Sequence, residues 1–435
     1  MNKSDVIIIG AGATGLMAAY TLVKAGKSVT VLEARSRIGG RIHTSTNKGF
    51  SGPVELGAEF VHGNLPVTLG LLKEAGLATH GVDFEMWQYH NGSFAQSDEF
   101  IEGFGAFLKK LNTLQHDMPL HDFLEQSFAG PQHATMRIQI KNYVSGYDTA
   151  DVHDASAFAL RNEWNHEDED AQHRVNGGYC TLLNYLAAAI KESGSEIVLN
   201  SAVADVFWES GAVKANTTGG TIYEAAKAII ALPLGVLQAP KDSEGALQFQ
   251  PPLKEQAEAI HNIGFGSVIK ILLEFDGIFW EGDAVTKRAG ADLSTMGFLF
   301  SDEEIPTFWT QAPAHSPLLT GWLGGPPAHQ KKHMPDETIL ELTLASLSNI
   351  FNISPEVLKN KLVVWQVANW TAEPYTRGSY AYDKVKSPDA RRVLLQPVEH
   401  TIYFAGEYLY DGPAMGTVEA ALTSGKNVAA MVLKG

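Results

Sequence analysis

Three glycines near the start of the chain have the spacing of a phosphate-binding loop. Gly10, Gly12 and Gly15 form a G-x-G-x-x-G motif directly after the short apolar run 5–9. The first glycine permits a tight turn, the second lets a pyrophosphate approach the backbone, and the third allows a helix to pack closely on the strand. A helix would follow the loop, and its free N–H groups and positive dipole would face the phosphates. This chemistry is that of a dinucleotide-binding site.

An acidic residue and a second glycine-rich turn follow at distances that suit the same ligand. Glu33 follows the second apolar run, 28–32, about 20 residues after the glycine loop, where a carboxylate accepts hydrogen bonds from the adenosine ribose. Gly39, Gly40 and Arg41 come soon afterwards. They offer a flexible backbone and a guanidinium for pyrophosphate oxygens. A strand, a helix and a second strand must therefore place these residues at one edge of a parallel sheet.

A lysine in the middle of an apolar run is the second feature that could take part in chemistry. The run 265–275, FGSVIKILLEF, alternates as a β-strand, with Lys270 between Val268 and Leu272 on one face. An ammonium is rarely buried unless it has a partner. The strand alone therefore predicts a half-solvated face, on which Glu274 is a weak partner for Lys270.

The composition limits the class of protein and its partners. The chain has 435 residues, which favours two domains, and its formal net charge of −16 argues against nucleic-acid and anionic-membrane partners. The same charge mildly favours a cationic small molecule. The single cysteine, Cys180, excludes an internal disulfide and suits a reducing compartment, so we expect a cytoplasmic protein. Asp5 argues against a signal peptide, and no apolar stretch of about 18 residues predicts a membrane-spanning helix.

These motifs resemble those of the flavin-containing amine oxidase family, which includes monoamine and polyamine oxidases and the lysine-specific histone demethylases. The Gly-Gly-Arg turn is similar to the family's FAD-binding signature, so the resemblance implies FAD rather than NAD. Val54–Gly63, VELGAEFVHG, is similar to the segment that runs beside the flavin ring. The resemblance implies that Gly57 and Ala58 let the ring approach the backbone. It also implies that His62 faces the substrate, as in animal polyamine oxidases.

Further stretches extend the resemblance over most of the chain. Val203 corresponds to the residue whose backbone meets the adenine, and Lys270 to a lysine that reaches flavin N5 through a water molecule. Gly406 and Glu407 would meet the ribityl and pyrophosphate groups. A helix beginning at Val418 would direct its N–H groups at the flavin pyrimidine oxygen. The implied FAD-binding residues are Gly10, Gly12, Ala13, Gly15, Glu33, Arg35, Gly39, Gly40, Arg41, Gly57, Ala58, Val203, Gly406, Glu407 and Val418.

The substrate side of the resemblance departs from the family at two positions. Tyr380 keeps one wall of the aromatic cage that holds the amine, and Trp370 is implied as another wall. Thr417 stands where monoamine oxidases carry the opposite aromatic residue, so we expect a cage that is open on one side and prefers bulky or secondary amines. Ser379 replaces the cysteine that bonds to the flavin in monoamine oxidases, so we expect non-covalent FAD. The implied catalytic residues are Lys270, Tyr380, His62, Trp370 and Thr417.

The order of the motifs predicts an α/β fold in two discontinuous parts. A Rossmann-like FAD-binding domain is expected at 1–80, 174–242 and 394–435. A mixed α+β substrate-binding domain is expected at 81–173 and 243–393, with the active site between the two.

The predicted function is FAD-dependent oxidation of a primary or secondary amine. The resemblance implies hydride transfer to flavin N5, hydrolysis of the resulting imine, and reoxidation by molecular oxygen with release of hydrogen peroxide. Three alternatives stay open: an L-amino-acid oxidase, a flavin desaturase or isomerase, and a non-catalytic FAD-binding protein. The amino-acid oxidase would need an arginine for the substrate carboxylate, and the candidates are Arg161, Arg174 and Arg377.

The segment 162–173 is rich in acidic residues. It would suit the path of a cationic substrate, although a solvated loop is the simpler interpretation. His166 and His173 lie beside these acids, but their spacing matches no metal-ligand pattern, so no metal is predicted.

Overall fold

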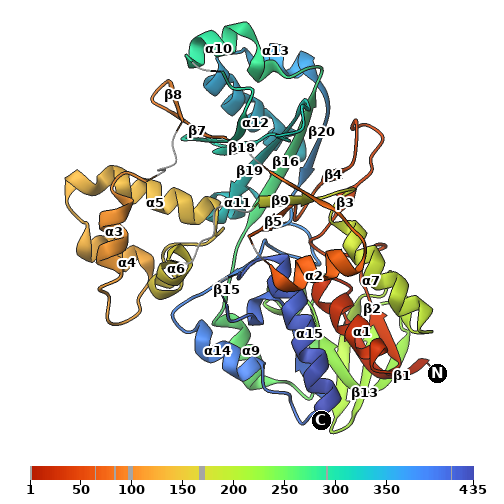
Figure 1. The fold of residues 1–435 in the computed structure, drawn as a ribbon. Helices are drawn as coiled ribbons and strands as arrows, with labels where there is room; N and C mark the ends of the chain where they lie inside the picture. The colour runs from red at the N-terminus through yellow and green to blue at the C-terminus, as the bar shows by residue number, and fades with distance from the viewer. Residues whose placement is uncertain are drawn as a thin grey trace.

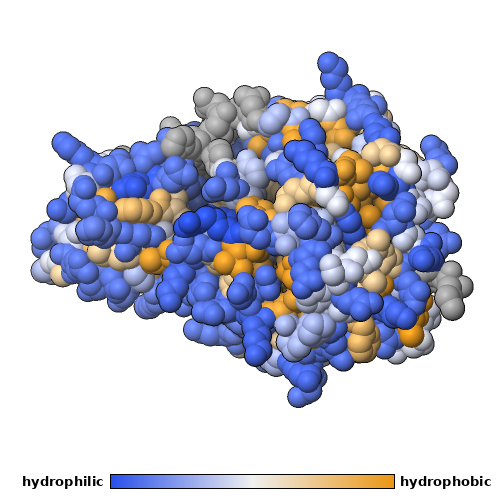
Figure 2. All heavy atoms as spheres, turned by 90° about the horizontal axis from the view of Figure 1, so that it is seen from below, coloured by the Kyte–Doolittle hydropathy of each residue, from blue (hydrophilic) through white to orange (hydrophobic). Residues whose placement is uncertain are grey.

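The computed structural model describes residues 2–63, 65–82, 85–96, 101–165, 172–290, 292–412 and 414–435. These residues form two large β-sheets with helices packed against them, and a separate group of helices lies beside the second sheet (Figure 1). The α/β class predicted from the sequence is confirmed. Hydrophilic side chains cover most of the face shown in Figure 2, and hydrophobic ones gather there in small groups. Among the described helices, none combines the length and hydropathy needed to cross a bilayer.

The first sheet contains the strand that precedes the glycine loop. Its strands lie in the order β10, β2, β1, β13, β12, β11 and β14, and β22 also pairs with β13. β10, β2, β1, β13 and β22 pair in parallel, as in nucleotide-binding α/β sheets. The bounds are β1 Asn2–Ile9, β2 Val29–Leu32, β10 Glu196–Val198, β11 Val203–Glu209, β12 Ala212–Thr217, β13 Ile222–Ile230, β14 Gln248–Gln250 and β22 Ile402–Phe404.

Helices cover both faces of this sheet, and one of them, α15, begins at the residue that the resemblance implies. The helices on one face are α1 (Ala13–Lys24), α2 (Pro66–Glu74), α7 (Cys180–Glu192) and α15 (Val418–Lys434). Those on the other face are α8 (Leu234–Leu237), α9 (Lys254–His261) and α14 (Ser387–Leu394). The start of α1 lies at the glycine loop, and α15 begins at Val418. The N-termini of both helices therefore approach the region expected to hold the cofactor.

A buried carboxylate fixes α15 to α2. Glu419, in the first turn of α15, accepts hydrogen bonds from the N–H groups of Val67 at 2.9 Å and Thr68 at 2.7 Å. It also accepts one from the Thr68 hydroxyl at 2.7 Å. These N–H groups lie in the first turn of α2, where no intrahelical acceptor serves them. Glu419 of α15 thus supplies the hydrogen-bond acceptor for the first turn of α2.

The second sheet contains the lysine-bearing strand. Its strands lie in the order β20, β16, β19, β18, β17, β7 and β8. The bounds are β7 Glu85–His90, β8 Ser93–Gln96, β16 Val268–Phe275, β17 Met296–Ser301, β18 Thr307–Trp309, β19 Leu318–Gly324 and β20 Leu362–Ala368. The helices α10 (Asp283–Ala289), α11 (Gly325–Lys331), α12 (Asp336–Phe351) and α13 (Pro355–Lys361) accompany it, as does the 3-10 helix η2 (Phe279–Glu281).

The prediction of a half-solvated face on β16 is wrong, because every residue of this strand is buried. β16 is an inner strand, paired on its two sides with β19 and β20. One face of β16 packs in the core together with α12, through Ile269, Ile271, Leu273 and Phe275. Val268 and Leu272 pack in a second cluster on the other face. Glu274 is not the partner of Lys270, since its carboxylate accepts the Ser51 N–H at 3.0 Å. Lys270 therefore needs its partner from outside the strand.

Smaller elements connect the two sheets and complete the chain. The helical group consists of α3 (Phe104–Leu111), α4 (Leu120–Ser127), η1 (Pro131–His133), α5 (Ala134–Gly146) and α6 (Ala157–Trp164) around its own apolar core. A three-stranded sheet is formed by β5 (Phe60–His62), β9 (Gln172–Val175) and β6 (Thr79–Gly81). The remaining elements are β3 (Thr44–Ser45) with β4 (Val54–Glu55), β15 (Gly264–Phe265) with β21 (Ala381–Tyr382), and η3 (Glu407–Leu409). The division into two domains stays a prediction.

Candidate active site

One cavity of about 1050 Å³ unites most of the predicted residues. Its wall includes Gly12 and Glu33 beside the first sheet, and Lys270 and Tyr380 on the substrate side. A volume of this size exceeds that of most single small-molecule sites, as expected for a dinucleotide together with a substrate. The predicted residues that line it are Gly10, Gly12, Ala13, Glu33, Arg35, Gly39, Gly40, Arg41, Gly57, Ala58, His62, Val203, Lys270, Trp370, Tyr380, Gly406, Glu407, Thr417 and Val418.

Gly15 is the predicted residue that does not line the cavity, and its role is packing. A Cβ atom on Gly15 would lie 1.9 Å from the carbonyl oxygen of Gly10. Gly10 itself has a φ of +107°, which favours glycine. A Cβ atom on Gly12, in contrast, would meet no protein atom within 4 Å. Gly12 therefore leaves backbone exposed to the cavity at the N-terminus of α1, where an anionic group is stabilised.

Glu33 and Arg35 form the part of the wall that suits a ribose. The Glu33 carboxylate accepts the Ala11 N–H at 2.8 Å and the Arg35 N–H at 3.0 Å, and the side chain is 4% exposed. The Arg35 guanidinium donates to the Thr376 hydroxyl at 2.7 Å and pairs with Glu373. Sequence reasoning missed Glu373, which links this turn to a distant part of the chain.

Two arginines, Arg37 and Arg41, fix the Gly-Gly-Arg turn by hydrogen bonds. Arg37, which sequence reasoning missed, donates to the carbonyl oxygens of Gly40 at 2.9 Å and Ile42 at 3.3 Å. Burial, with a smaller contribution from Arg35, lowers the pKa of Arg37 to about 10, so the guanidinium stays charged at physiological pH. Arg41 donates to the carboxylate of Glu407 at 2.9 Å. That Arg41 and Glu407 also contact the pyrophosphate stays a prediction.

The glycine-rich segments leave a cradle that suits FAD. A Cβ atom on Gly57 would lie 1.8 Å from the Arg41 carbonyl oxygen and 3.2 Å from the Trp370 ring. Trp370 is fixed in turn, because its indole N–H donates to the Leu56 carbonyl at 2.8 Å. Gly57 is therefore required for close packing against the Arg41 backbone, and both Gly57 and Ala58 line the cavity. These residues, with the α1 N-terminus, fit a flavin dinucleotide.

Lys270 lies at the wall of the cavity with its side chain 1% exposed. Its ammonium donates to the Glu59 carboxylate at 2.8 Å and to the Gly57 carbonyl at 3.2 Å. It also lies 5.1 Å from the centre of the Trp309 ring, within the range of a cation–π interaction. An ammonium has three N–H donors, so one donor stays available to a group in the cavity.

Glu59 is the principal functional residue that sequence reasoning missed. It directly precedes β5, and its carboxylate accepts the Lys270 ammonium, the Arg174 Nε–H at 3.0 Å and the Trp309 indole N–H at 3.1 Å. Burial raises the pKa of Glu59, but the charges of Lys270 and Arg174 and the hydrogen bonds outweigh burial and hold that pKa below its usual value. Glu59 is therefore an anion between two buried cations.

An aromatic cluster forms part of the substrate side of the cavity. Phe60 lies 5.8 Å from Phe298 and 6.2 Å from Trp309, measured between ring centres, and Trp309 lies 5.8 Å from Trp322. All four rings line the cavity. His62 lines it as well, and burial lowers the pKa of His62, against a hydrogen bond with Gln172 that raises it. The imidazole is therefore neutral at physiological pH.

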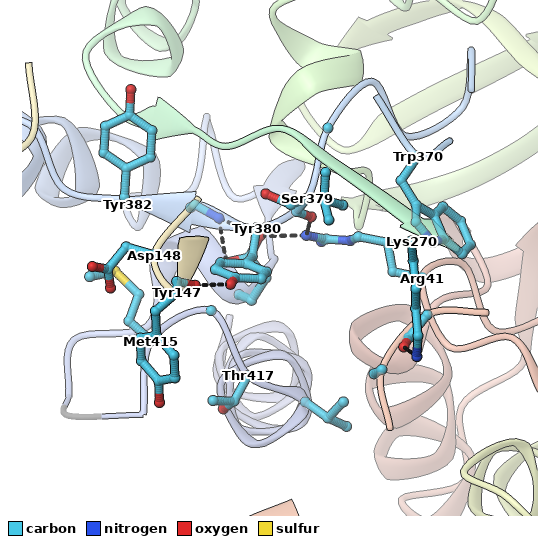
Figure 3. A pocket seen from close by; sticks show the side chains of 18 of the residues that line it. Arg41, Tyr147, Asp148, Lys270, Trp370, Ser379, Tyr380, Tyr382, Met415 and Thr417 are labelled. Atoms are coloured by element: carbon cyan, nitrogen blue, oxygen red, sulfur yellow. Dashed lines mark hydrogen bonds and ion pairs between the residues drawn. The ribbon is translucent and has the colours of Figure 1, made fainter. Parts of the chain in front are cut away.

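Tyr380 and Thr417 also line the cavity (Figure 3). The Tyr380 hydroxyl donates to the Tyr147 carbonyl. Burial raises the pKa of Tyr380, and the charges of Asp148 and Glu163 raise it further, so the phenol stays neutral. Thr417 caps α15 by accepting the Ala420 N–H at 3.3 Å. Thr417 thus has a structural role and offers only a small side chain to the cavity.

The three arginines proposed to bind an amino-acid carboxylate are all engaged elsewhere. Arg174 donates to Glu59 and to the carbonyl oxygens of residues 310 and 312. Arg161 donates to the Leu114 carbonyl at 3.1 Å, and Arg377 to the Glu244 carbonyl at 2.6 Å. None of the three lines the cavity among the residues that the structure describes. The geometry therefore gives no support to the amino-acid oxidase alternative.

The acidic segment 162–173 is described only in part. His166 lies outside the described residues, and His173 belongs to β9, where it pairs with Val61. Glu163 and Gln172, near its two ends, line the cavity. Within the described part of the chain, no group of three or more His, Cys, Asp or Glu side chains is arranged to hold a metal.

A comparison with protein families decides the class of this chain. The model of the flavin containing amine oxidoreductases matches residues 13–433. The chain belongs to this family. It is therefore a flavoprotein oxidoreductase that acts on the C–N bonds of amines, and the predicted family, FAD cofactor and enzyme class are confirmed.

Individual members of the family cover nearly the whole chain. Polyamine oxidase 4 of Oryza sativa subsp. japonica is 28% identical, over 98% of this chain and 87% of the rice protein. Lysine-specific histone demethylase 2 of Homo sapiens is 30% identical over 93% of this chain, which corresponds to 50% of the human protein. Putrescine oxidase bound to putrescine has a TM-score of 0.81 at 22% identity and covers 100% of this chain and 99% of its own. Cyclohexylamine oxidase from Brevibacterium oxydans IH-35A has a TM-score of 0.80 at 20% identity, with 99% of both chains covered. At these identities, the two solved structures show a common fold.

The attachment of FAD is testable at Ser379. The Ser379 hydroxyl lies 2.5 Å from the Thr149 hydroxyl and is 3% exposed, and a serine has no thiolate to bond to the flavin. We expect acid precipitation to release all of the flavin into the supernatant as FAD, measured by absorbance and chromatography. Flavin that stays in the washed, denatured pellet would show that another residue forms a covalent bond.

Proposed function

We propose that the chain oxidises a small-molecule amine, with FAD as the hydride acceptor and molecular oxygen as the final electron acceptor. For a primary amine, the balanced reaction consumes the amine, oxygen and water, and yields an aldehyde, ammonia and hydrogen peroxide. The observation that supports this proposal is the continuity of the cavity, which unites Gly12 and Glu33 with Lys270 and Tyr380. Bound FAD supplies the redox chemistry, and the chain binds and orients the substrate.

The aromatic part of the wall would prepare the amine for oxidation. An amine reaches the protein as an ammonium ion but must lose a proton before its nitrogen lone pair can assist departure of the hydride. Low-polarity surroundings disfavour the charged form and promote this loss. Phe60, Trp309 and Tyr380 provide such surroundings, and the neutral imidazole of His62 would orient the nitrogen by a hydrogen bond.

Acidic residues near Tyr380 favour a substrate that keeps a second positive charge. Asp148 and Glu163 both line the cavity, and both act electrostatically on the Tyr380 hydroxyl. The rings of Tyr143 and Tyr147 also line the cavity and stack on each other, with centres 5.4 Å apart. Carboxylates with aromatic faces are a combination that binds ammonium groups. We therefore propose diamines or polyamines as the substrates, in line with the names of the polyamine and putrescine oxidases that resemble this chain.

A comparison of amines of equal chain length tests both parts of the proposal. We expect an α,ω-diamine to bleach the flavin without oxygen and to yield peroxide with oxygen. Its kcat/KM should exceed that of the matching monoamine roughly tenfold to a hundredfold, because a hydrogen bond to a charged group contributes about 1.5–3 kcal/mol. Glu163→Gln should lower the value for the diamine more than for the monoamine. Glu125→Gln, an exposed carboxylate on α4, is the matched control.

The outcomes separate the two parts. If no monoamine, diamine, polyamine or secondary amine bleaches the flavin, amine oxidation is wrong, and a desaturase or a non-catalytic FAD-binding protein becomes the better interpretation. If diamines and monoamines react equally well, amine oxidation stands and the diamine assignment is wrong.

A further inference from the structure

A cluster of three buried charges lies at the wall of the cavity, which two of its members, Lys270 and Glu59, line. The cluster consists of Lys270 of β16, Glu59 directly before β5, and Arg174 of β9. Their side chains are 1%, 6% and 10% exposed, respectively. Glu59 is 2.8 Å from the Lys270 ammonium and 3.0 Å from the Arg174 guanidinium. Three separate elements therefore meet in one ion cluster.

Arg174 is the immobile cation of this cluster. Besides Glu59, its guanidinium donates to the carbonyl oxygens of Thr310 at 3.0 Å and Ala312 at 2.9 Å, and it lies 4.6 Å from the Phe60 ring centre. These contacts anchor Arg174, in β9, to the loop that follows β18. Lys270, in contrast, keeps an N–H donor available and lines the cavity.

The charges that face Lys270 come from several elements. Glu59 and Arg174 are in the cluster, and Glu55 of β4 acts on Lys270 electrostatically from a greater distance. Burial raises the pKa of Glu55, with hydrogen bonds from Tyr179 and Thr44 opposing it, so Glu55 is the weaker anion of the two. The register partners of Lys270 on β19 and β20 are uncharged residues, at positions 322 and 368. Glu59 is thus the principal counter-charge.

We propose that Glu59 is a positioning residue that holds Lys270 as a charged ammonium with one donor directed to the cofactor side of the cavity. This inference rests on the proposed function. A buried ammonium without a counter-ion is strongly disfavoured, and a second cation beside it disfavours it further. Removal of the Glu59 charge leaves Lys270 facing Arg174, with the more distant and weaker anion Glu55 as its counter-charge. The neutral amine form of Lys270 would then relieve both the burial of charge and the repulsion.

Glu59→Gln should therefore make the properties of bound FAD depend on pH in a new way. At low pH, Lys270 in this variant carries its proton and the protein should behave like the parent. As the pH rises, Lys270 loses the proton, the positive charge beside the cofactor disappears, and the midpoint potential of FAD should fall. The rate of anaerobic flavin reduction should change over the same pH interval, roughly tenfold to a hundredfold. The parent should show neither transition in that interval.

Three further variants separate the contribution of Lys270 from unrelated effects. Glu274→Gln removes another buried carboxylate from β16, one that accepts the Ser51 N–H and does not touch Lys270, and it should show no new transition. Glu59→Gln combined with Lys270→Met should also lack the transition, because the titrating group is gone. Glu59→Asp keeps the charge and should restore the parental pH dependence in part.

Thermal unfolding supplies a readout that requires no turnover. If Glu59 serves as counter-charge to Lys270, the double variant should melt at a higher temperature than Glu59→Gln alone, even if the single variant folds poorly. An equally unstable double variant, or a Glu59→Gln potential that follows the parent at every pH, would overturn the inference. Failure of the proposed function is recognised separately, since no amine would then reduce the parent enzyme, whereas the potential and the melting curves are measured without an amine.

Discussion

Lys270→Met should slow turnover roughly tenfold to a hundredfold while FAD stays bound. Methionine keeps the length and apolar stem of the side chain but removes the charge and the N–H donors. A hydrogen bond to a charged partner contributes about 1.5–3 kcal/mol, which corresponds to that range of rates. FAD should stay bound, because the glycine loop, Glu33 and the Arg41–Glu407 pair form no hydrogen bond or ion pair with Lys270 and are unchanged. Stopped-flow absorbance with and without oxygen would show which half-reaction slows.

The fold should tolerate this substitution, and that makes the experiment informative. Glu59 keeps its hydrogen bonds from Arg174 and Trp309 when Lys270 is removed, so the carboxylate is not left without a counter-ion. Flavin content and the melting temperature should therefore be close to those of the parent. A fully flavinated Lys270→Met with both half-reactions at parental rates would remove Lys270 from the mechanism.

Gly12→Ala should abolish or severely weaken FAD binding without disturbing the folded chain. The φ of Gly12 is −76°, which alanine adopts readily, and a Cβ atom there would meet no protein atom within 4 Å. The methyl group would instead occupy the side from which a pyrophosphate approaches the backbone. We expect at least about tenfold weaker affinity, a loss of about 1.4 kcal/mol, measured by titration of the apoprotein with FAD.

Alanine substitutions at two other glycines serve as controls for this result. Gly70→Ala on α2 also meets no protein atom within 4 Å, but Gly70 is exposed and does not line the cavity, so FAD affinity should not change. Gly15→Ala would place its Cβ 1.9 Å from the Gly10 carbonyl oxygen and should destabilise the protein itself. Parental affinity in Gly12→Ala would mean that the pyrophosphate does not approach the loop at this position.

Features encoded in one short stretch were predictable from the sequence. Gly12, Gly15 and Glu33 lie within a single strand–helix–strand unit, and the geometry of that unit follows from local spacing. The start of α15 at Val418 is similarly local, because Thr417 provides the N-cap hydroxyl. For such features, the backbone conformation and the neighbouring side chains are both specified within about 30 residues.

The environment of Lys270 was not predictable in this way. Its partner Glu59 lies 211 positions earlier in the chain, and the two meet only because β5 packs against the second sheet. The nearer carboxylate, Glu274, was the wrong choice, since it turns to the Ser51 N–H instead. A weak signal was present, however: Glu59 is one of two acids, with Glu55, in the largely apolar run VELGAEFVHG, and Lys270 is the one base in its own strand. Opposite charges in two separate, largely apolar runs suggest a buried pair.

The same difficulty applies to the ion pairs that close the nucleotide part of the cavity. Arg41 pairs with Glu407 across 366 positions, and Arg35 with Glu373 across 338. Arg41 was assigned to FAD because a guanidinium suits pyrophosphate oxygens, and Arg35 was assigned from the resemblance. The structure shows that both arginines also join distant segments to the glycine-rich turns. No local pattern specifies such pairs, because they depend on how the complete chain is folded.

The buried carboxylate of Glu419 has a consequence for biosynthesis. The N-terminal turn of α2 lacks its acceptor until α15 is in place, and Gly406, Glu407 and Val418 form part of the cavity wall. A nascent chain that has exposed only its glycine loop and Glu33 therefore has the phosphate-binding motif but not the enclosed pocket. Folding of the nucleotide site must await the emergence of α15 from the ribosome, as expected for a domain assembled from distant parts of the chain. Newly made protein would thus acquire its flavin only after α15 has been synthesised, and the supply of FAD would act on the folding of chains that have passed this stage.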